Sequence, residues 1–116
     1  MANQTEHLDR IFHALADPTR RGIVKRLIRG PASVSELAKP LSMALPTVVQ
    51  HLRDLEESGL VRSTKKGRVR TCEVETAVLS DAGSWIAEQK ALWQTRFDRL
   101  EAFLERSEEE TDGDDG

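Results

Sequence analysis

The sequence predicts a mostly α-helical domain with one small β-hairpin, its elements following in the order α-α-α-α-β-β-α. Apolar residues recur at the three- and four-residue spacing of a helix in five segments. Between the fourth and the fifth, residues 60–65 and 68–74 are typical of two strands. Lys66-Gly67 should join these strands, because glycine accepts the positive φ of a tight turn.

The first helix is expected over about residues 6–16, with four apolar residues at helical spacing. These are Leu8, Ile11, Phe12 and Leu15. Asp17-Pro18-Thr19 then indicates an N-cap followed by proline at the first position of a second helix. That helix should end at Gly30-Pro31.

Two further helices follow at short range. Ser33-Val34-Ser35-Glu36 is a capping box that should open a short third helix, and Pro40 should end or kink it near its last turn. A fourth helix then has Pro46 in its first turn and Gly59 just past its end. Its apolar stripe comprises Leu45, Val48, Leu52 and Leu55.

The opposite face of the fourth helix is polar, uncharged in its first half and charged in its second. Two helices joined by a tight turn, with the second presenting polar residues, form the helix-turn-helix pattern. A lysine- and arginine-rich hairpin follows directly. This order predicts a winged helix-turn-helix domain, with the fourth helix as recognition helix and the hairpin as wing, a plan suited to reading double-stranded DNA.

The last helix should run from about Thr76 to about Arg106 and carries two apolar seams. One seam comprises Ile86, Trp93, Phe97, Leu100 and Leu104, and the other includes Trp85, Leu92 and Phe103. A single domain of this size covers only one side of such a helix. We therefore expect part of it to pack on a second copy of the chain, although both seams folding onto the same chain is also open.

Charge is unevenly distributed along the 116 residues, whose net charge is −3. Residues 105–116 carry seven acids and one base, and subtracting their −6 from −3 leaves +3 for residues 1–104. Local charge governs binding, because salt screens charges more than ~8–10 Å apart. We expect residues 1–106 to form the DNA-binding and dimerisation domain and residues 107–116 to be a disordered acidic tail. The tail serves as a solubilising end or competes with DNA for the wing.

Several classes of protein are disfavoured. The chain has no glycine-rich phosphate loop, no G-x-S-x-G motif and no His-Glu pairing at metal spacing, so we expect no enzyme and no cofactor. It also lacks a long apolar run and a signal-peptide pattern, which favours a cytoplasmic protein without a membrane partner. A single cysteine, Cys72, excludes a disulfide within the chain.

Residues 8–104 resemble the ArsR/SmtB family of bacterial winged-helix repressors. The matching motifs are Ala14–Arg21 with Ile23-Val24, Ser35–Ala38, Pro46–Leu52 continuing through Leu55–Val61, and Gly67-Arg68 in the wing. The resemblance implies a homodimer joined through its first and last helices, which binds an imperfect palindrome and usually represses transcription. The residues expected at this dimer interface are Leu8, Ile11, Phe12, Trp85, Leu92, Trp93, Phe97 and Leu100.

The sequence departs from the family in three respects. Metal-sensing members carry cysteines in the third helix or Asp, His and Glu ligands on the last helix. This chain has no third-helix cysteine and no histidine after His51, so we expect no metal site. Ala44 replaces the small polar residue that commonly caps the recognition helix, and Val49 stands where the family often places serine.

Nine residues are candidates for DNA contact: Thr47, Val49, Gln50, His51, Arg53, Lys65, Lys66, Arg68 and Arg70. Gln50 can pair bidentately with adenine, and Thr47 or Val49 can offer a methyl group to thymine. His51 lies on a flank, where packing or capping is an equal alternative, and Arg53 should reach a phosphate or a neighbouring acid. Wing lysines should contact phosphate, while an arginine could enter a narrow minor groove.

Rival functions remain open. A winged-helix module for protein–protein contacts would use the basic wing against an acidic partner. Alternatively, a small molecule or thiol oxidation switches DNA binding, with Cys72 as the redox group rather than a small strand residue. The sequence names neither the operator, nor the inducer, nor the sign of regulation.

Overall fold

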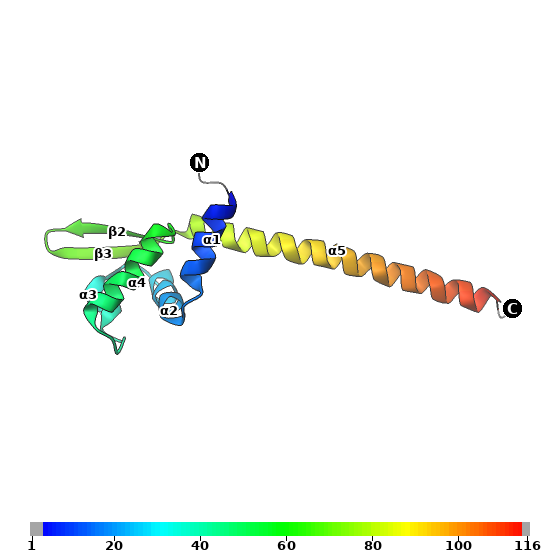
Figure 1. The fold of residues 1–116 in the computed structure, drawn as a ribbon, viewed down its shortest axis with the longest axis horizontal. Helices are drawn as coiled ribbons and strands as arrows, with labels where there is room; N and C mark the ends of the chain where they lie inside the picture. Colours follow the sequence, from blue (N-terminus) through cyan, green and yellow to red (C-terminus); the bar gives the residue numbers. More distant parts are fainter. Residues whose placement is uncertain (1–3, 115–116) are drawn as a thin grey trace. The chain divides into compact units, whose positions relative to one another are not determined.

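The structure is a computed structural model, which describes the backbone of residues 4–114 and the side chains of residues 4–109. Its elements are α1 (Gln4–Leu15), α2 (Pro18–Ile28), β1 (Ala32–Ser33), α3 (Val34–Ala38), α4 (Leu45–Glu57), β2 (Val61–Lys66), β3 (Val69–Val74) and α5 (Thr76–Asp114). Figure 1 shows α1 to α4 beside the β2–β3 hairpin, with α5 following as one long helix. The predicted winged helix-turn-helix order is confirmed.

The helix boundaries are set locally, largely as the sequence predicted. Asp17 caps α2 by accepting a hydrogen bond from the Arg20 backbone N–H at 3.0 Å, and Pro18 follows at the first helical position. Ser33 and Glu36 form the capping box of α3. Gly59 has a φ of +85°, the left-handed conformation expected just past the end of α4.

A short strand that the sequence did not indicate completes the sheet. β1 pairs antiparallel with β3, and the strand order is β1-β3-β2. Two residues give no periodic signal, so β1 is recognisable only from its partner. The hairpin turn is also displaced by one residue, because Lys66 pairs with Val69 and leaves Gly67 and Arg68 in the turn. A positive φ at Gly67 alone, +61°, fits a type II′ turn.

One apolar core lies between the helices and the sheet. Its fully buried side chains include Ile11 from α1, Val48 and Leu55 from α4, and Cys72 from β3. The predicted stripe of α4 is confirmed at Val48, Leu52 and Leu55. Leu45 is an exception at 55% exposure, because it is the first residue of the helix and does not join the core cluster.

The α5 helix extends to Asp114, eight residues beyond the predicted end at Arg106. The disordered acidic tail over residues 107–116 stays a prediction, and residues 115 and 116 lie outside the described residues. Glutamate is a good helix former, and no glycine interrupts the chain between Arg106 and Gly113. The chain forms two compact units, Met1–Ala82 and Gly83–Gly116, and the predicted domain over residues 1–106 stays a prediction.

None of the helices within residues 4–114 combines the length and apolar character needed to cross a lipid bilayer.

Candidate nucleic-acid interface

The exposed face of α4 carries three of the predicted DNA-contact residues. Thr47, Gln50 and Arg53 are exposed, while Val49 is half-buried. Within residues 4–109, no hydrogen bond or ion pair engages the Arg53 side chain, although neighbouring acids were one of its two predicted partners. Ala44 at the N-cap provides no side-chain hydrogen bond, as its methyl group requires.

His51 lies in a polar cluster between α2 and α4. Its Nδ1 is 3.3 Å from Arg20 Nη1 and 3.9 Å from Asp17 Oδ2, and its side chain is only 17% exposed. The surroundings of His51 therefore favour the packing alternative over a base contact.

Arg20 is the centre of this cluster. Its Nε donates to the Ala14 carbonyl at 2.7 Å and its Nη2 to the His13 carbonyl at 3.1 Å, which satisfies carbonyls at the end of α1. Its Nη1 is 3.4 Å from Asp54 Oδ2 on α4. With a side chain 11% exposed, Arg20 holds three helices together.

Gln50 is linked to the same cluster through Asp54. Its Nε2 donates to Asp54 Oδ1 at 3.2 Å, one helical turn further along α4. The two oxygens of Asp54 thus receive different donors, one from Gln50 and one from Arg20. A side chain predicted to read a base is therefore connected to the interior of the domain.

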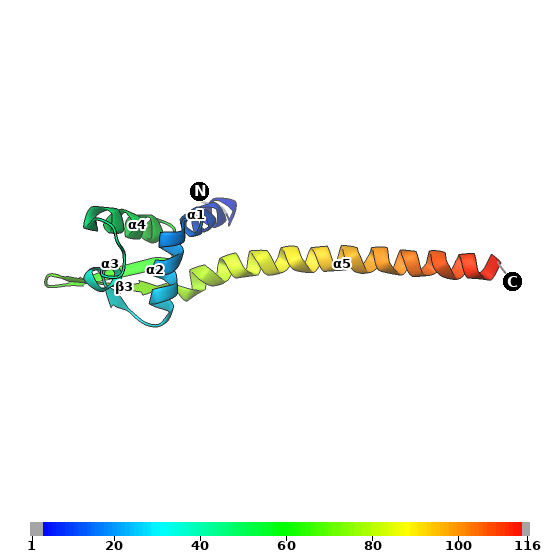
Figure 2. The same cartoon turned by 90° about the horizontal axis from the view of Figure 1, so that it is seen from below.

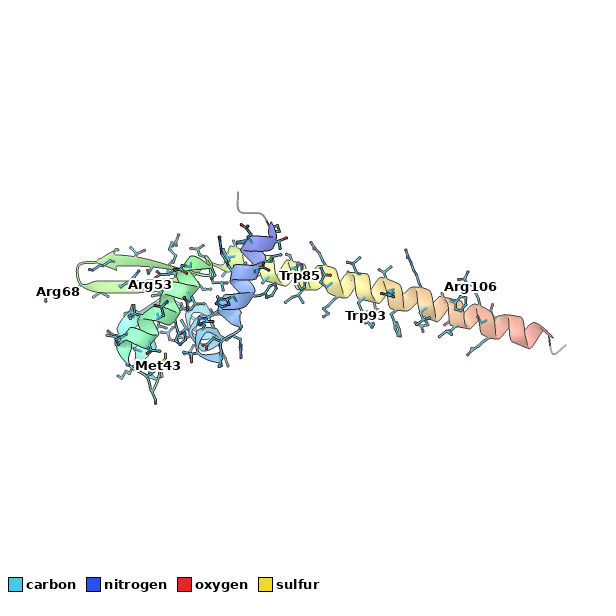
Figure 3. All side chains as sticks on the ribbon, in the orientation of Figure 1. Met43, Arg53, Arg68, Trp85, Trp93 and Arg106 are labelled. Atoms are coloured by element: carbon cyan, nitrogen blue, oxygen red, sulfur yellow. The ribbon has the colours of Figure 1, made fainter. Side chains whose placement is uncertain are left out.

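The wing carries three cations without a protein partner. In the described part of the chain, no hydrogen bond or ion pair engages the side chains of Lys65, Lys66 or Arg68, and all three are exposed. Figures 1 and 2 show the β2–β3 hairpin extending past the neighbouring helices in both views, and Figure 3 places Arg68 at its tip. These groups are available to an external anion.

The other two bases of this segment are neutralised by acids. Arg70 Nη2 lies 3.3 Å from Glu56 Oε2 of α4, and Arg70 Nε donates to Ser63 Oγ at 2.9 Å. Arg62 stands opposite Glu73 in the strand register and pairs with it at 3.0 Å. The hydrogen bond to Glu73 and the charge of Glu75 raise the pKa of Arg62. Arg70 is thus less available to DNA than the sequence implied.

Strand alternation places Lys65 and Lys66 on opposite faces of the hairpin. Lys65 pairs in register with Arg70, so it shares the face that Arg70 turns toward α4. Two like charges directly opposite each other destabilise a hairpin, a cost that the Arg70–Glu56 pair reduces.

Besides Arg62, the side chains of Asp17 and Cys72 have perturbed pKa values. The Arg20 backbone N–H donates to Asp17 and holds the pKa of that carboxyl below its ordinary value of 3.8. Burial raises the pKa of the Cys72 thiol, and the nearby Glu56 carboxylate adds to the rise while Arg70 opposes it. Cys72 is fully buried, so the structure favours a packing role over a redox role.

The helix-turn-helix segment of this chain is shared with known transcriptional regulators. A model described as a helix-turn-helix domain matches residues 15–64. The HTH-type transcriptional regulator Rv2034 of Mycobacterium tuberculosis is 43% identical over 72 residues, which are 62% of this chain and 67% of the relative. The biofilm growth-associated repressor of Xylella fastidiosa is 32% identical over 85 residues, 71% of this chain and 75% of the relative.

A crystal structure of an ArsR family transcriptional regulator is 54% identical, with a TM-score of 0.75, and the match covers 81% of this chain and 97% of that structure. The chain belongs to the ArsR family. As in these relatives, its helix-turn-helix domain makes it a DNA-binding transcriptional regulator.

Members of the ArsR family that sense metals need a ligand cluster. In the part of this ArsR-family chain that the structure describes, no three His, Cys, Asp or Glu side chains come together in a group that could hold a metal ion.

The residues predicted at the dimer interface of this ArsR-family chain fall into two groups. Ile11 and Leu8 are 0% and 8% exposed within one chain, so they have little surface left for a second copy. Phe12 is half-buried against the same core. By contrast, all the large apolar residues of both α5 seams are 43% to 68% exposed. They are Trp85, Ile86, Leu92, Trp93, Phe97, Leu100, Phe103 and Leu104.

Sequence reasoning missed Arg20 and Asp54 as parts of this ArsR-family site. They are 34 positions apart, so no local pattern pairs them. The available signals were the position of Arg20 within the Ala14–Arg21 motif and the four-residue spacing of Asp54 from Gln50.

Proposed function

We propose that this ArsR-family regulator binds an inverted-repeat operator as a homodimer and represses transcription. The observation that carries this proposal is the character of two adjoining exposed surfaces. The face of α4 presents uncharged side chains together with Arg53, and the hairpin presents Lys65, Lys66 and Arg68. Within residues 4–109, no ion pair engages any of these four cations. Gln50 and Thr47 would meet base edges in the major groove, Arg53 would reach a backbone phosphate, and Lys65, Lys66 and Arg68 would contact the flanking backbone or minor groove.

The second copy is supported by the apolar surface of α5. At 100° per residue, its eight exposed large apolar side chains fall within one arc of roughly 140°. Monomeric proteins rarely expose a continuous apolar stripe of this kind, whereas pairing α5 with a second α5 would bury it. Two-fold symmetry would then set the recognition helices ~34 Å apart, one turn of DNA.

The deciding experiment is selection of bound duplexes from the organism's own genomic DNA, followed by footprinting. We expect protected half-sites related by two-fold symmetry, and a transcript that rises when the protein is removed. Binding that shows no preference over random competitor duplex at low salt would contradict the proposal. A transcript that falls on removal would retain DNA binding but contradict repression.

A further inference from the structure

The side chain of Gln50 is already restrained in the protein without DNA. Its carboxamide has two N–H donors and one acceptor oxygen. One N–H is directed to Asp54 Oδ1 at 3.2 Å. An ionised carboxylate only accepts, so the nitrogen of the amide must face Asp54 and the orientation of the carboxamide is determined.

Asp54 is itself anchored. Its second oxygen, Oδ2, accepts from Arg20 Nη1 at 3.4 Å, and Arg20 is fastened to the Ala14 and His13 carbonyls at the end of α1. The Asp54 side chain is 28% exposed and that of Arg20 is 11% exposed. Gln50 is therefore restrained, through Asp54, by the largely buried guanidinium of Arg20.

The restraint leaves the reading edge of the amide unoccupied. In the described residues, Gln50 Oε1 and its second N–H have no partner. A bidentate contact with adenine uses one amide oxygen and one N–H, directed at N6 and N7. The hydrogen bond to Asp54 is therefore compatible with that contact and orients it.

We propose that Asp54, held by Arg20, is a positioning residue that presets the Gln50 amide for one base pair of each half-site. This inference rests on the proposed operator binding, and it assigns to Asp54 a role in the sequence specificity of that binding. Ordering a flexible side chain at an interface weakens binding by about 2- to 12-fold. Only the duplex with the correct base pair gains the Gln50 contact, so presetting Gln50 strengthens binding to that duplex and not to the others.

The test uses the operator selected by the wild-type protein and a panel of duplexes with one base pair changed at each half-site position. Affinities are measured at one salt concentration for wild type, Gln50→Ala, Asp54→Ala and the double variant. Glu57→Ala is the matched control, because it removes the same charge from the exposed surface of α4 without a contact to Gln50 in the described structure.

We expect Gln50→Ala to reduce discrimination at one base pair by roughly 5- to 150-fold. Asp54→Ala should reduce discrimination at the same base pair by about 2- to 12-fold. In the Gln50→Ala background, Asp54→Ala should change discrimination no further, since no amide remains to be positioned. Glu57→Ala should shift affinity for every duplex alike.

Unchanged discrimination in Asp54→Ala, or an equal loss at every position, would overturn the inference while leaving operator binding intact. A wild-type protein that selects no sequence would overturn both. Thermal unfolding of each variant checks that it is folded at the assay temperature. If Asp54→Ala is not, Asp54→Leu is tested in the same way, because its side chain fills the position and offers no acceptor oxygen.

Discussion

Arg70 of β3 and Glu56 of α4 form an ion pair, with Nη2 3.3 Å from Oε2. Ser63 strengthens the junction, because its hydroxyl donates to Glu56 and accepts from Arg70. The base of the wing is thereby attached to the recognition helix, while the tip residue Arg68 has no partner among the described residues. Within one cationic hairpin, Arg70 is therefore paired inside the protein, whereas Arg68 is available to an external anion.

The first prediction compares these two arginines. Arg68→Ala should flatten the slope of log affinity against log salt by ~0.9 for each DNA phosphate that the arginine neutralises. Arg70→Ala should flatten it less and instead lower the free energy of unfolding by about 0.5–1 kcal/mol, because the partly exposed pair with Glu56 is removed. Salt titrations and denaturant unfolding of both variants measure this. Equal slopes for the two variants would show that Arg70 also contacts DNA.

The second prediction concerns the apolar surface of α5. Trp93→Glu should separate the proposed dimer into monomers, since burial of Trp93 in both copies would contribute about 3 kcal/mol, or roughly 100-fold in the dimer Kd. Ala91→Glu places the same charge on the opposite side of the helix and should leave the dimer intact. Sedimentation equilibrium distinguishes the two. A monomeric wild type would defeat the proposed dimer.

The third prediction is that Cys72 is unreactive in the folded protein. The thiol is fully buried and its pKa is raised, so little thiolate is exposed at neutral pH. Reaction with an aromatic disulfide reagent should be on the order of 100-fold slower than in denaturant, because it requires local opening. Peroxide should leave operator affinity unchanged. A rapid native reaction would restore the redox alternative.

The fourth prediction follows from the lowered pKa of Asp17. A carboxylate with a lowered pKa in the folded state contributes stability above its unfolded value of 3.8, and this stability is lost as pH falls through the folded value. Asp17→Asn keeps a capping oxygen but does not titrate. The unfolding midpoints of wild type and Asp17→Asn should therefore converge as pH falls below 3.8, with wild type showing the steeper decline. Parallel curves would mean that Asp17 makes no such contribution.

Local features of the fold were predictable because nearby residues produce them. The Asp17 cap, the Ser33–Glu36 capping box and the left-handed Gly59 each depend on backbone groups within a few positions. The hairpin position was predictable to one residue. The two-residue strand β1 was not, because it exists only through pairing with β3.

The candidate interface was predictable in composition and only partly in detail. Exposure of Gln50 and Arg53 followed from helical periodicity, as did the apolar seams of α5. Burial of Leu8 and Ile11 within one chain was not recognised, because an apolar stripe looks the same whether it meets its own core or a second copy.

The sequence by itself determined the order of the helices and the hairpin, the helix caps, and which helix face is polar, since these depend on spacing along the chain. Only the tertiary structure decided which charged side chains are paired with one another within the protein. Strand register set Arg62 against Glu73, helix packing brought Glu56 to Arg70, and residues 34 positions apart joined Arg20 to Asp54. The energy of an ion pair falls off over a few ångströms, and only the folded structure specifies the distance between two charges that are far apart in the sequence.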